Sequence, residues 1–316
     1  MKNSRVAKSF NIQYPVIQAA MTWLTSAEFV AAVSNAGGLG VLGPNAGQKE
    51  NAKNPIDAAE KMRKQIQKTR ALTNNPFAVN YLLPVDGHEA SFRYSEPLLN
   101  VFYEENVEIA VAVSYGDKSK KTDIEKLKNN GIKVIYREIS PTVENSTNAQ
   151  NLGVDALIVT GHEAGGYLSQ HRISTLTLLP QVIDSVNIPV IAAGGIFNSK
   201  TAKAAFVMGA EGVYMGTRFI NTFECPASTQ CKDEIIRTSS QELWESSTPF
   251  GLVRLSSSAG RKSTLTNEET DYVDGFRRGM LVGDVDHAFI CVSESAGGIH
   301  NIVNCEDLVR EIMEVR

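Results

Sequence analysis

Short apolar runs of strand length recur along the chain, and segments with helical periodicity lie between them. The runs are rich in Val, Ile and Ala, and Gly or Pro bounds most of them. Their apolar positions are continuous rather than alternating, which is typical of parallel strands buried on both faces. We therefore expect strands over residues 16–20, 39–43, 77–83, 107–113, 133–139, 156–161, 189–195 and 212–217.

The segments between these runs predict helices, several of which end at a glycine. Helices are expected over residues 26–35, 55–70, 123–130, 175–185 and 199–208, with closing helices over 273–285 and 291–316. Strands that alternate with helices predict an α/β fold built on a parallel sheet. Eight such strands favour a (β/α)8 TIM barrel, for which about 250 residues is typical. A doubly wound open sheet is the alternative.

The character of the chain changes after Thr217. Residues 222–275 are polar and rich in Ser and Thr, so we interpret them as a lid, an insertion after strand eight that folds over the barrel mouth and binds substrate. Residues 1–221 together with 276–316 would then form the barrel. The insertion also contains Arg254, Arg261 and Lys262. We interpret these as solvated surface charges, with contact to an anionic substrate or to the phosphate of NADPH as the alternative.

Composition and charge exclude several classes of protein. The 316 residues are 42% hydrophobic and 21% charged, which is typical of a globular protein. Because 31 basic residues oppose 35 acidic ones, the net charge is −4, and we expect no binding to nucleic acid. The sequence shows neither a transmembrane stretch nor a signal peptide, so we expect a cytoplasmic protein without a membrane partner. The 4 cysteines match no zinc spacing and predict reduced thiols and no metal site.

Glycines at the ends of the last two predicted strands indicate a phosphate-binding site. Gly194 and Gly195 end the strand over 189–195, and Gly216 and Thr217 end the next one. In a barrel these are strands seven and eight, and the loops after them commonly bind phosphate. Glycine lacks Cβ, so backbone N–H groups there can approach an anion closely. The alternative is that these glycines only terminate strands.

Other motifs lie at the ends of predicted strands one, three and six. Residues 161–167 contain the paired glycines Gly165 and Gly166, which would let the backbone approach a flat or phosphorylated ligand. Residues 18–21 carry small side chains that would fit beneath a planar ring. Asn80 is a single amide in an apolar run, and it is either a ligand contact or a core amide bonded to backbone.

Taken in order, these motifs resemble those of a family of FMN-dependent barrel enzymes. The family comprises the nitronate monooxygenases, formerly called 2-nitropropane dioxygenases, and the FMN-containing enoyl-acyl-carrier-protein reductases of type II. The resemblance is carried by Tyr14-Pro-Val-Ile-Gln-Ala-Ala-Met21, Ala36-Gly-Gly-Leu-Gly40, Pro76-Phe-Ala-Val-Asn80, Glu163-Ala-Gly-Gly166, Ala193-Gly-Gly195 and Met215-Gly-Thr-Arg-Phe219.

The resemblance implies that FMN is the cofactor and that named residues bind it. Its phosphate would rest on Gly194, Gly195, Gly216 and Thr217, and its isoalloxazine ring would lie over Ala19, Ala20 and Met21. Asn80 would bond to the polar edge of the flavin, and Gly165, Gly166 and Met215 would complete the cofactor site. Residues 293–297 resemble the small-residue segment that returns to the phosphate side in this family.

One departure from the family pattern concerns catalysis. Family members usually place histidine directly after the Ala-Gly-Gly triplet, where it serves as catalytic base or proton donor, and this sequence has Tyr167 there. A phenol with a pKa of about 10 is a poor base at neutral pH, although it can donate a proton. Tyr167 is therefore the first catalytic candidate. His162 and His171 are further candidates, with an ordinary loop or surface histidine as the alternative for each.

Three functions are consistent with this resemblance. In the first, which we favour, an alkyl nitronate reduces FMN and oxygen reoxidises it. In the second, NAD(P)H reduces FMN and the hydride passes to an enoyl thioester or a quinone. The third is a non-catalytic flavin binder. An enzyme like inosine monophosphate dehydrogenase is disfavoured because no cysteine lies near predicted strand six. A small molecule is the expected substrate, and a homodimer is the candidate oligomer.

Overall fold

The computed structural model describes residues 4–85, 89–116, 120–248, 251–256 and 272–314. Within these ranges, eight parallel strands form one sheet in the order β1-β9-β8-β6-β5-β4-β3-β2. Ile17 of β1 bridges to Leu39 beside β2, so the two outer strands meet and the sheet closes. The strands are β1 (Val16–Gln18), β2 (Gly40–Leu42), β3 (Phe77–Leu82), β4 (Ile109–Ser114), β5 (Lys133–Glu138), β6 (Ala156–Thr160), β8 (Val190–Ala193) and β9 (Gly212–Met215). The TIM barrel prediction is confirmed, and the open sheet is excluded.

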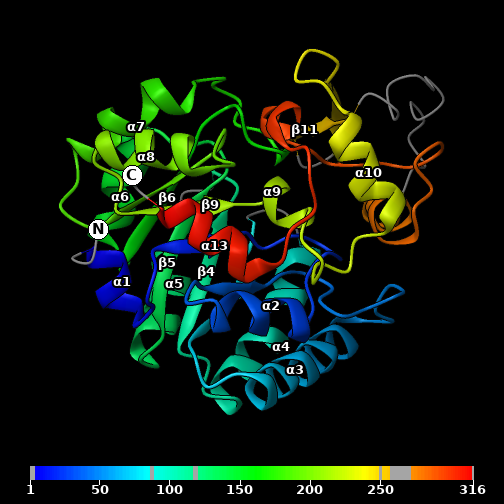
Figure 1. Cartoon of the computed structure of the whole chain (residues 1–316). Coiled ribbons are helices and arrows are strands. Elements are labelled where there is room, and N and C mark those ends of the chain that lie inside the picture. The colour runs from blue at the N-terminus through cyan, green and yellow to red at the C-terminus, as the bar shows by residue number, and fades with distance from the viewer. Residues whose placement is uncertain (1–3, 86–88, 117–119, 249–250, 257–271, 315–316) are drawn as a thin grey trace.

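Helices surround the strands and cover their outer face (Figure 1). They are α1 (Arg5–Phe10), α2 (Ala27–Asn35), α3 (Pro55–Leu72), α4 (Glu89–Glu104), α5 (Lys121–Asn129), α6 (Val143–Asn151), α7 (Thr175–Ile183) and α8 (Ser199–Val207). Side-chain caps fix several starts: Ser26, Asn54 and Ser174 each accept a hydrogen bond from a backbone N–H in the first turn. No described helix combines the length and apolar character needed to cross a bilayer.

Three of these helices, α1, α4 and α6, are absent from the sequence prediction. Helix α4 contains Pro97, a residue that normally argues against a helix interior. Helix α6 is rich in Asn and Thr, which have low helix propensity. A capping box formed by Thr142 and Asn145 starts α6, and its buried Ser146 and Ala149 pack inward. Tertiary packing and a local cap therefore outweigh weak propensity.

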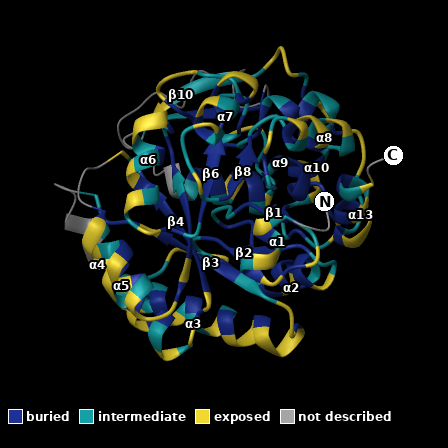
Figure 2. Ribbon diagram, turned by 90° about the vertical axis from the view of Figure 1, so that its left-hand side faces the viewer, coloured by how far each residue is buried: buried dark blue, intermediate teal, exposed yellow. Residues whose placement is uncertain are grey.

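Apolar side chains are buried on both faces of the barrel, which explains the continuous apolar runs. Ile17, Val111, Ile135 and Ile158 belong to a cluster that fills the barrel interior. A second cluster, with Phe29 among its members, lies between the strands and the helices. Figure 2 shows the resulting pattern, with buried strands at the centre and exposed surface on the outer helices. Because strand positions alternate between these faces, Arg137 shares the inward face with Ile135.

The segment predicted as an insertion contributes a helix and a small antiparallel sheet on one side of the barrel (Figure 1). After the short α9 (Thr217–Ile220) it contains α10 (Thr229–Arg237), β10 (Trp244–Thr248) and β11 (Gly251–Leu255). Strand β11 pairs with β10 and also with β7 (Gly166–Tyr167), a short strand in the loop after β6. The insertion is thus joined to the barrel at the predicted glycine motif. Its role as a lid and its limits at 222 and 275 stay predictions.

The C-terminal region corrects one helix prediction. The helix expected over 273–285 is present as α12 (Tyr272–Phe276) and the π-helix η1 (Arg277–Val282). The helix expected over 291–316 is wrong for its first part, because α13 covers only Cys305–Met313. The preceding chain forms the short 3-10 helix η2 (Glu294–Gly298), and Asn304 caps the start of α13.

Candidate active site

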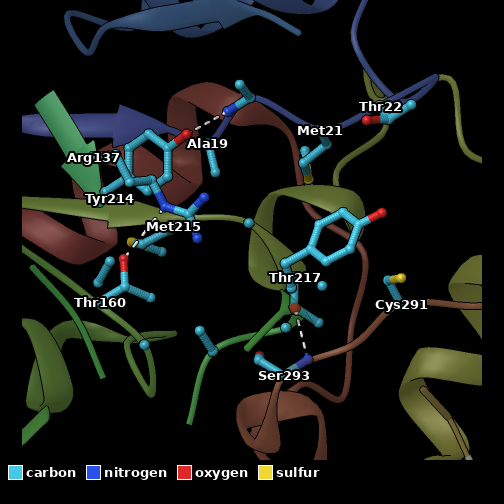
Figure 3. A pocket seen from close by; sticks show the side chains of 18 of the residues that line it. Ala19, Met21, Thr22, Arg137, Thr160, Tyr214, Met215, Thr217, Cys291 and Ser293 are labelled. Carbon is cyan, nitrogen blue, oxygen red and sulfur yellow. Dashed lines mark hydrogen bonds between the residues drawn. The ribbon is translucent and has the colours of Figure 1, made fainter. Parts of the chain in front are cut away.

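A cavity lined by described residues opens at the carboxyl ends of the barrel strands. Ala19, Arg137, Thr160 and Tyr214 lie together on one side of it, where strands end (Figure 3). Cys291 and Ser293, from the C-terminal segment, face the same cavity. In TIM barrels this face carries the active site.

The cavity brings together every residue that the sequence assigns to a cofactor. Its lining includes Ala19, Ala20, Met21, Asn80, Gly165, Gly166, Gly194, Gly195, Met215, Gly216 and Thr217. These residues come from five separate loops or strand ends, and the fold places all of them around one space. That they bind a cofactor stays a prediction at this point.

Glycines give the cavity a wall of exposed backbone. Gly194 and Gly195 both have left-handed backbone, with φ of 92° and 72°. A Cβ on Gly194 would lie 2.9 Å from the Gly161 carbonyl oxygen. Among the described residues, no oxygen accepts a hydrogen bond from the backbone N–H of Gly195 or Gly216. These N–H groups are therefore free to bind an anion.

Hydroxyl groups extend this wall. The Thr217 Oγ1 accepts a hydrogen bond of 3.0 Å from the Ser293 backbone N–H (Figure 3). The hydroxyls of Ser293 and Ser295 are hydrogen bonded to each other, and both side chains line the cavity. The sequence resemblance placed the 293–297 segment on the phosphate side, and the structure brings it against Thr217.

Small side chains after β1 form a second wall. The backbone N–H of Ala20 donates a 2.8 Å hydrogen bond to the phenol oxygen of Tyr214, which fixes the path of this segment (Figure 3). Burial raises the pKa of the Tyr214 phenol, so it stays neutral. Met21 points into the cavity from the same segment. The segment thus presents a largely apolar surface to the cavity.

The polar side chains of Asn80 and Arg137 reach the cavity from the barrel interior. Asn80 is 4% exposed, and its Nδ2 donates a 3.0 Å hydrogen bond to the Val111 carbonyl oxygen. It is therefore a core amide bonded to backbone and also part of the lining, so the two interpretations of the sequence are compatible. Arg137 Nε lies 3.4 Å from Thr160 Oγ1, and no described carboxylate lies within ion-pair distance of the guanidinium.

Tyr167 lines the cavity beside a second phenol. It lies on β7, and its ring meets that of Tyr115 edge-on, with centroids 5.9 Å apart and an interplanar angle of 81°. Burial raises the pKa of Tyr115. Tyr167 pairs with Val253 of β11, so the predicted insertion holds the strand that carries it. Tyr115 was missed at the sequence level because a tyrosine after a strand carries no distinguishing pattern.

The two histidine candidates do not line the cavity. His162 lies behind the glycine loop, where its Nε2 is 3.0 Å from Arg254 Nη2 and 3.3 Å from a Glu245 carboxylate oxygen. His171 is exposed and lies outside the lining. Neither histidine therefore shares the cavity with Tyr167, because His162 precedes the lining residues Ala164 and Gly165 and His171 follows Tyr167 outside the lining.

Glu163 braces two loops instead of facing the cavity. Its carboxylate accepts hydrogen bonds of 2.8 Å from the Thr175 backbone N–H and 2.9 Å from the Thr175 hydroxyl. That hydroxyl also lies 3.0 Å from the Gly194 carbonyl oxygen. Glu163 thus holds the loop after β6 against the loop after β8, and both loops keep their glycines on the cavity.

The ionisable groups in the described lining are phenols, one guanidinium and one thiol. The described lining contains the phenols of Tyr115, Tyr167 and Tyr214, the guanidinium of Arg137 and the thiol of Cys291. It contains no Asp, Glu or His. Burial raises the pKa of Cys291 to about 12, so this thiol is neutral. The described part of the lining therefore offers a cation and proton donors, and it includes no base that works near neutral pH.

Comparison with known proteins identifies the family. A family model described as nitronate monooxygenase matches residues 3–314. The chain belongs to the nitronate monooxygenase family. It is 32% identical over 272 residues to a probable nitronate monooxygenase of Staphylococcus haemolyticus, covering 75% of this chain and 72% of that protein. A probable nitronate monooxygenase of Staphylococcus saprophyticus is 34% identical over 268 residues, covering 74% and 72%.

Solved structures agree with this assignment. FabK from Thermotoga maritima superposes with a TM-score of 0.84 at 29% identity, covering 99% of this chain and 95% of that one. Nitroalkane oxidase from Streptomyces ansochromogenes gives a TM-score of 0.77 over 98% and 97% of the chains, and at 23% identity it supports the fold alone. The chain is therefore an enzyme of the oxidoreductase class, as the sequence resemblance predicted.

Proposed function

We propose that this enzyme binds FMN in the cavity and oxidises an alkyl nitronate through it. The observation that carries the proposal is the described lining, which holds a cation and three phenols but no carboxylate or imidazole. A neutral nitroalkane must lose a carbon-bound proton before oxidation, and that step needs a base. A nitronate is already an anion, so its oxidation needs no base.

The residues present fit FMN at its phosphate end. Gly194, Gly195 and Gly216 line the cavity, and the N–H groups of Gly195 and Gly216 have no acceptor within the described chain. Hydroxyls of Ser293 and Ser295 lie on the same wall. A phosphate dianion requires several such donors, and a Cβ at these glycines would narrow the space.

The residues also fit the flavin ring. Ala19, Ala20 and Met21 offer a largely apolar surface for a planar ring, and Asn80 and Arg137 supply polar contacts at the inner end of the cavity. When bound, FMN accepts electrons from one substrate and passes them to another. The Arg137 guanidinium would favour negative charge on the ligand beside it, because a cation stabilises a nearby anion.

Tyr167 has the role of holding a proton next to the substrate. Its phenol lines the cavity, and at neutral pH a phenol keeps its proton. It can therefore hydrogen bond to the oxygens of a nitronate and orient that anion. Family membership supports FMN, while the positions of its contacts are part of this proposal.

A second function is favoured by the apolar side chains of the lining. These include Leu24, Pro44, Ile220, Val253, Phe276 and Met280. Such side chains suit a hydrocarbon chain, so an NAD(P)H-dependent reductase of an enoyl thioester or a quinone is the second candidate. In that reaction the Tyr167 phenol would supply the proton. The similarity to FabK of Thermotoga maritima favours this candidate as well.

Anaerobic reduction distinguishes the candidates. The flavin-loaded protein is mixed with propionate 3-nitronate, NADH or NADPH in the absence of oxygen, and flavin absorbance is recorded. We expect the nitronate to bleach the flavin. Bleaching by NADH or NADPH alone would replace this proposal by the reductase. Bleaching by none of the three would overturn both and leave a non-catalytic flavin binder.

Oligomeric state and location complete the proposal. We expect a cytoplasmic homodimer that acts on a small molecule. Light scattering coupled to gel filtration measures the mass directly, and one chain contributes 34.4 kDa. A mass near that of one chain would contradict the homodimer and leave the rest of the proposal unaffected.

A further inference from the structure

Arg254 is a buried cation outside the cavity that the proposed reaction does not use. It lies on β11 in the predicted insertion, and it is 3% exposed. The interpretation of Arg254 as a solvated surface charge is therefore wrong, while Arg261 and Lys262 lie outside the described residues. Burying a guanidinium is unfavourable unless its donors are paired, so its partners indicate what it does.

The first partners of Arg254 belong to the loop that leads to Tyr167. Its Nη1 donates hydrogen bonds to the carbonyl oxygens of His162 and Ala164, the latter at 2.8 Å. Its Nη2 lies 3.0 Å from His162 Nε2. The backbone of Arg254 is also in register with Gly166 in the β11–β7 pair. The Arg254 side chain thus binds the loop just before Gly165, Gly166 and Tyr167.

The remaining partners come from two other segments around the cavity. Arg254 Nη2 lies 3.3 Å from a carboxylate oxygen of Glu245 on β10 and 2.9 Å from one of Glu294 in η2. Glu294 lies between Ser293 and Ser295, whose hydroxyls line the cavity. The guanidinium therefore joins the insertion, the loop after β6 and the C-terminal segment at one point.

The loop after β6 and the C-terminal segment are packed so closely that one cannot shift without affecting the other. A Cβ on Gly165 would lie 2.6 Å from the backbone carbon of Val292 and 2.7 Å from the backbone nitrogen of Ser293. A small shift of the loop after β6 would therefore have to move the C-terminal segment or move Tyr167. Carbonyl oxygens bonded to a rigid, planar guanidinium resist such a shift.

We propose that Arg254 is a positioning residue that sets the place of Tyr167 in the cavity. It acts through the carbonyl oxygens of His162 and Ala164, and it touches neither the cavity nor its ligand. The proposal rests on the proposed function in so far as Tyr167 contacts the substrate. Lysine cannot replace arginine here, because an ammonium group cannot reach two carbonyl oxygens and two carboxylates at once.

The first test measures backbone protection without any reaction. Hydrogen exchange by mass spectrometry compares Arg254→Lys with Arg172→Lys in the FMN-free protein. Arg172 is the matched control, because it also pairs with Glu245, at 2.6 Å, but its side chain is 57% exposed and lies outside the cavity lining. For peptides that span 160–168 we expect at least about tenfold faster exchange in Arg254→Lys.

Two controls, the α3 peptides and Arg172→Lys, show whether the change is local. Peptides from α3 should keep wild-type exchange in Arg254→Lys, and Arg172→Lys should match the wild type throughout. Equal protection of residues 160–168 from hydrogen exchange in all three proteins would overturn the proposal. A uniform loss of protection over the whole chain of Arg254→Lys would overturn it as well. If Arg254→Lys fails to fold, Glu294→Gln removes a single ion pair of Arg254 and should give a smaller change confined to the same peptides and to 291–298.

The second test asks whether Arg254 acts through Tyr167. In a double-mutant cycle, kcat for the oxidation of propionate 3-nitronate is measured for Arg254→Lys, Tyr167→Phe and the double variant. We expect Arg254→Lys to lower kcat by about tenfold in the wild type and to have no further effect once Tyr167 is Phe. Additive effects would overturn the proposal. An unchanged kcat in Tyr167→Phe would refute the proposed role of Tyr167, and exchange at 160–168 would still decide whether Arg254 holds the loop.

Discussion

Gly194 offers the sharpest single perturbation of the proposed phosphate site. Alanine at this position must adopt a φ of 92°, which costs about 1–2 kcal/mol for a residue with a Cβ. Its Cβ would lie 2.9 Å from the Gly161 carbonyl oxygen and 3.0 Å from Thr175 Oγ1, so the loop must move. Overpacking of this kind adds about 1–3 kcal/mol. Together the two contributions predict a loss of about 2–5 kcal/mol in the free energy of unfolding.

Gly131 provides the matched control for this substitution. Its φ is 74°, and an added Cβ would meet no heavy atom within 4 Å. Gly131→Ala should therefore lower the free energy of unfolding only by the backbone contribution of about 1–2 kcal/mol. If these N–H groups bind the phosphate as proposed, the loop shift in Gly194→Ala should displace them and raise the Kd for FMN at least about tenfold, while Gly131→Ala should bind as the wild type does.

Two measurements check this pair. Urea denaturation of the FMN-free proteins gives the free energy of unfolding, and quenching of FMN fluorescence on titration gives the Kd. The reasoning is refuted if Gly194→Ala and Gly131→Ala lose the same stability. It is equally refuted if Gly194→Ala binds FMN as tightly as Gly131→Ala, because the Gly194 loop would then not contact the phosphate.

Further predictions concern the ionisable groups of the cavity. Tyr167→His should introduce a base of pKa about 6.5, so oxidation of a neutral nitroalkane should appear and rise as pH increases through that value; a pH-independent rate, or none, would count against the orientation of residue 167 toward the substrate. Arg137→Gln should raise the KM for an anionic nitronate by about tenfold while a neutral quinone substrate is affected less, and equal changes for both would contradict its electrostatic role. Outside the cavity, burial raises the pKa of the Cys225 thiol to about 12, so at pH 8 only about one such thiol in ten thousand is ionised and iodoacetamide should leave it unlabelled until the protein is unfolded; rapid labelling of the native protein, measured by mass spectrometry, would contradict this.

The fold could be predicted from the sequence because its signals are periodic. Continuous apolar runs appear wherever both faces of a strand are buried, and the barrel buries both faces of every strand. Helices with a clear cap, such as the one after Asn54, were placed within two residues of their ends. Helix α6 was missed because its Asn and Thr residues form a helix only with a local capping box and tertiary packing.

The candidate site was predictable where backbone geometry requires a particular residue. Gly194 must have a left-handed φ and no Cβ, and that demand is visible in the sequence as a glycine pair. Arg137 could have been found by the same reasoning as Asn80, as a lone polar residue on the inward face of an apolar strand. Tyr115 and Arg254 could not, because their positions depend on contacts between segments far apart in the chain.

The central claim is that this cavity holds FMN, and the visible spectrum of the purified protein tests it most directly. The FMN-free protein is incubated with one equivalent of FMN, freed of unbound ligand by gel filtration, and its flavin content is measured after denaturation. We predict close to one FMN per chain in the wild type and at least about tenfold weaker binding in Gly194→Ala. A folded wild-type protein that retains no flavin would contradict the account.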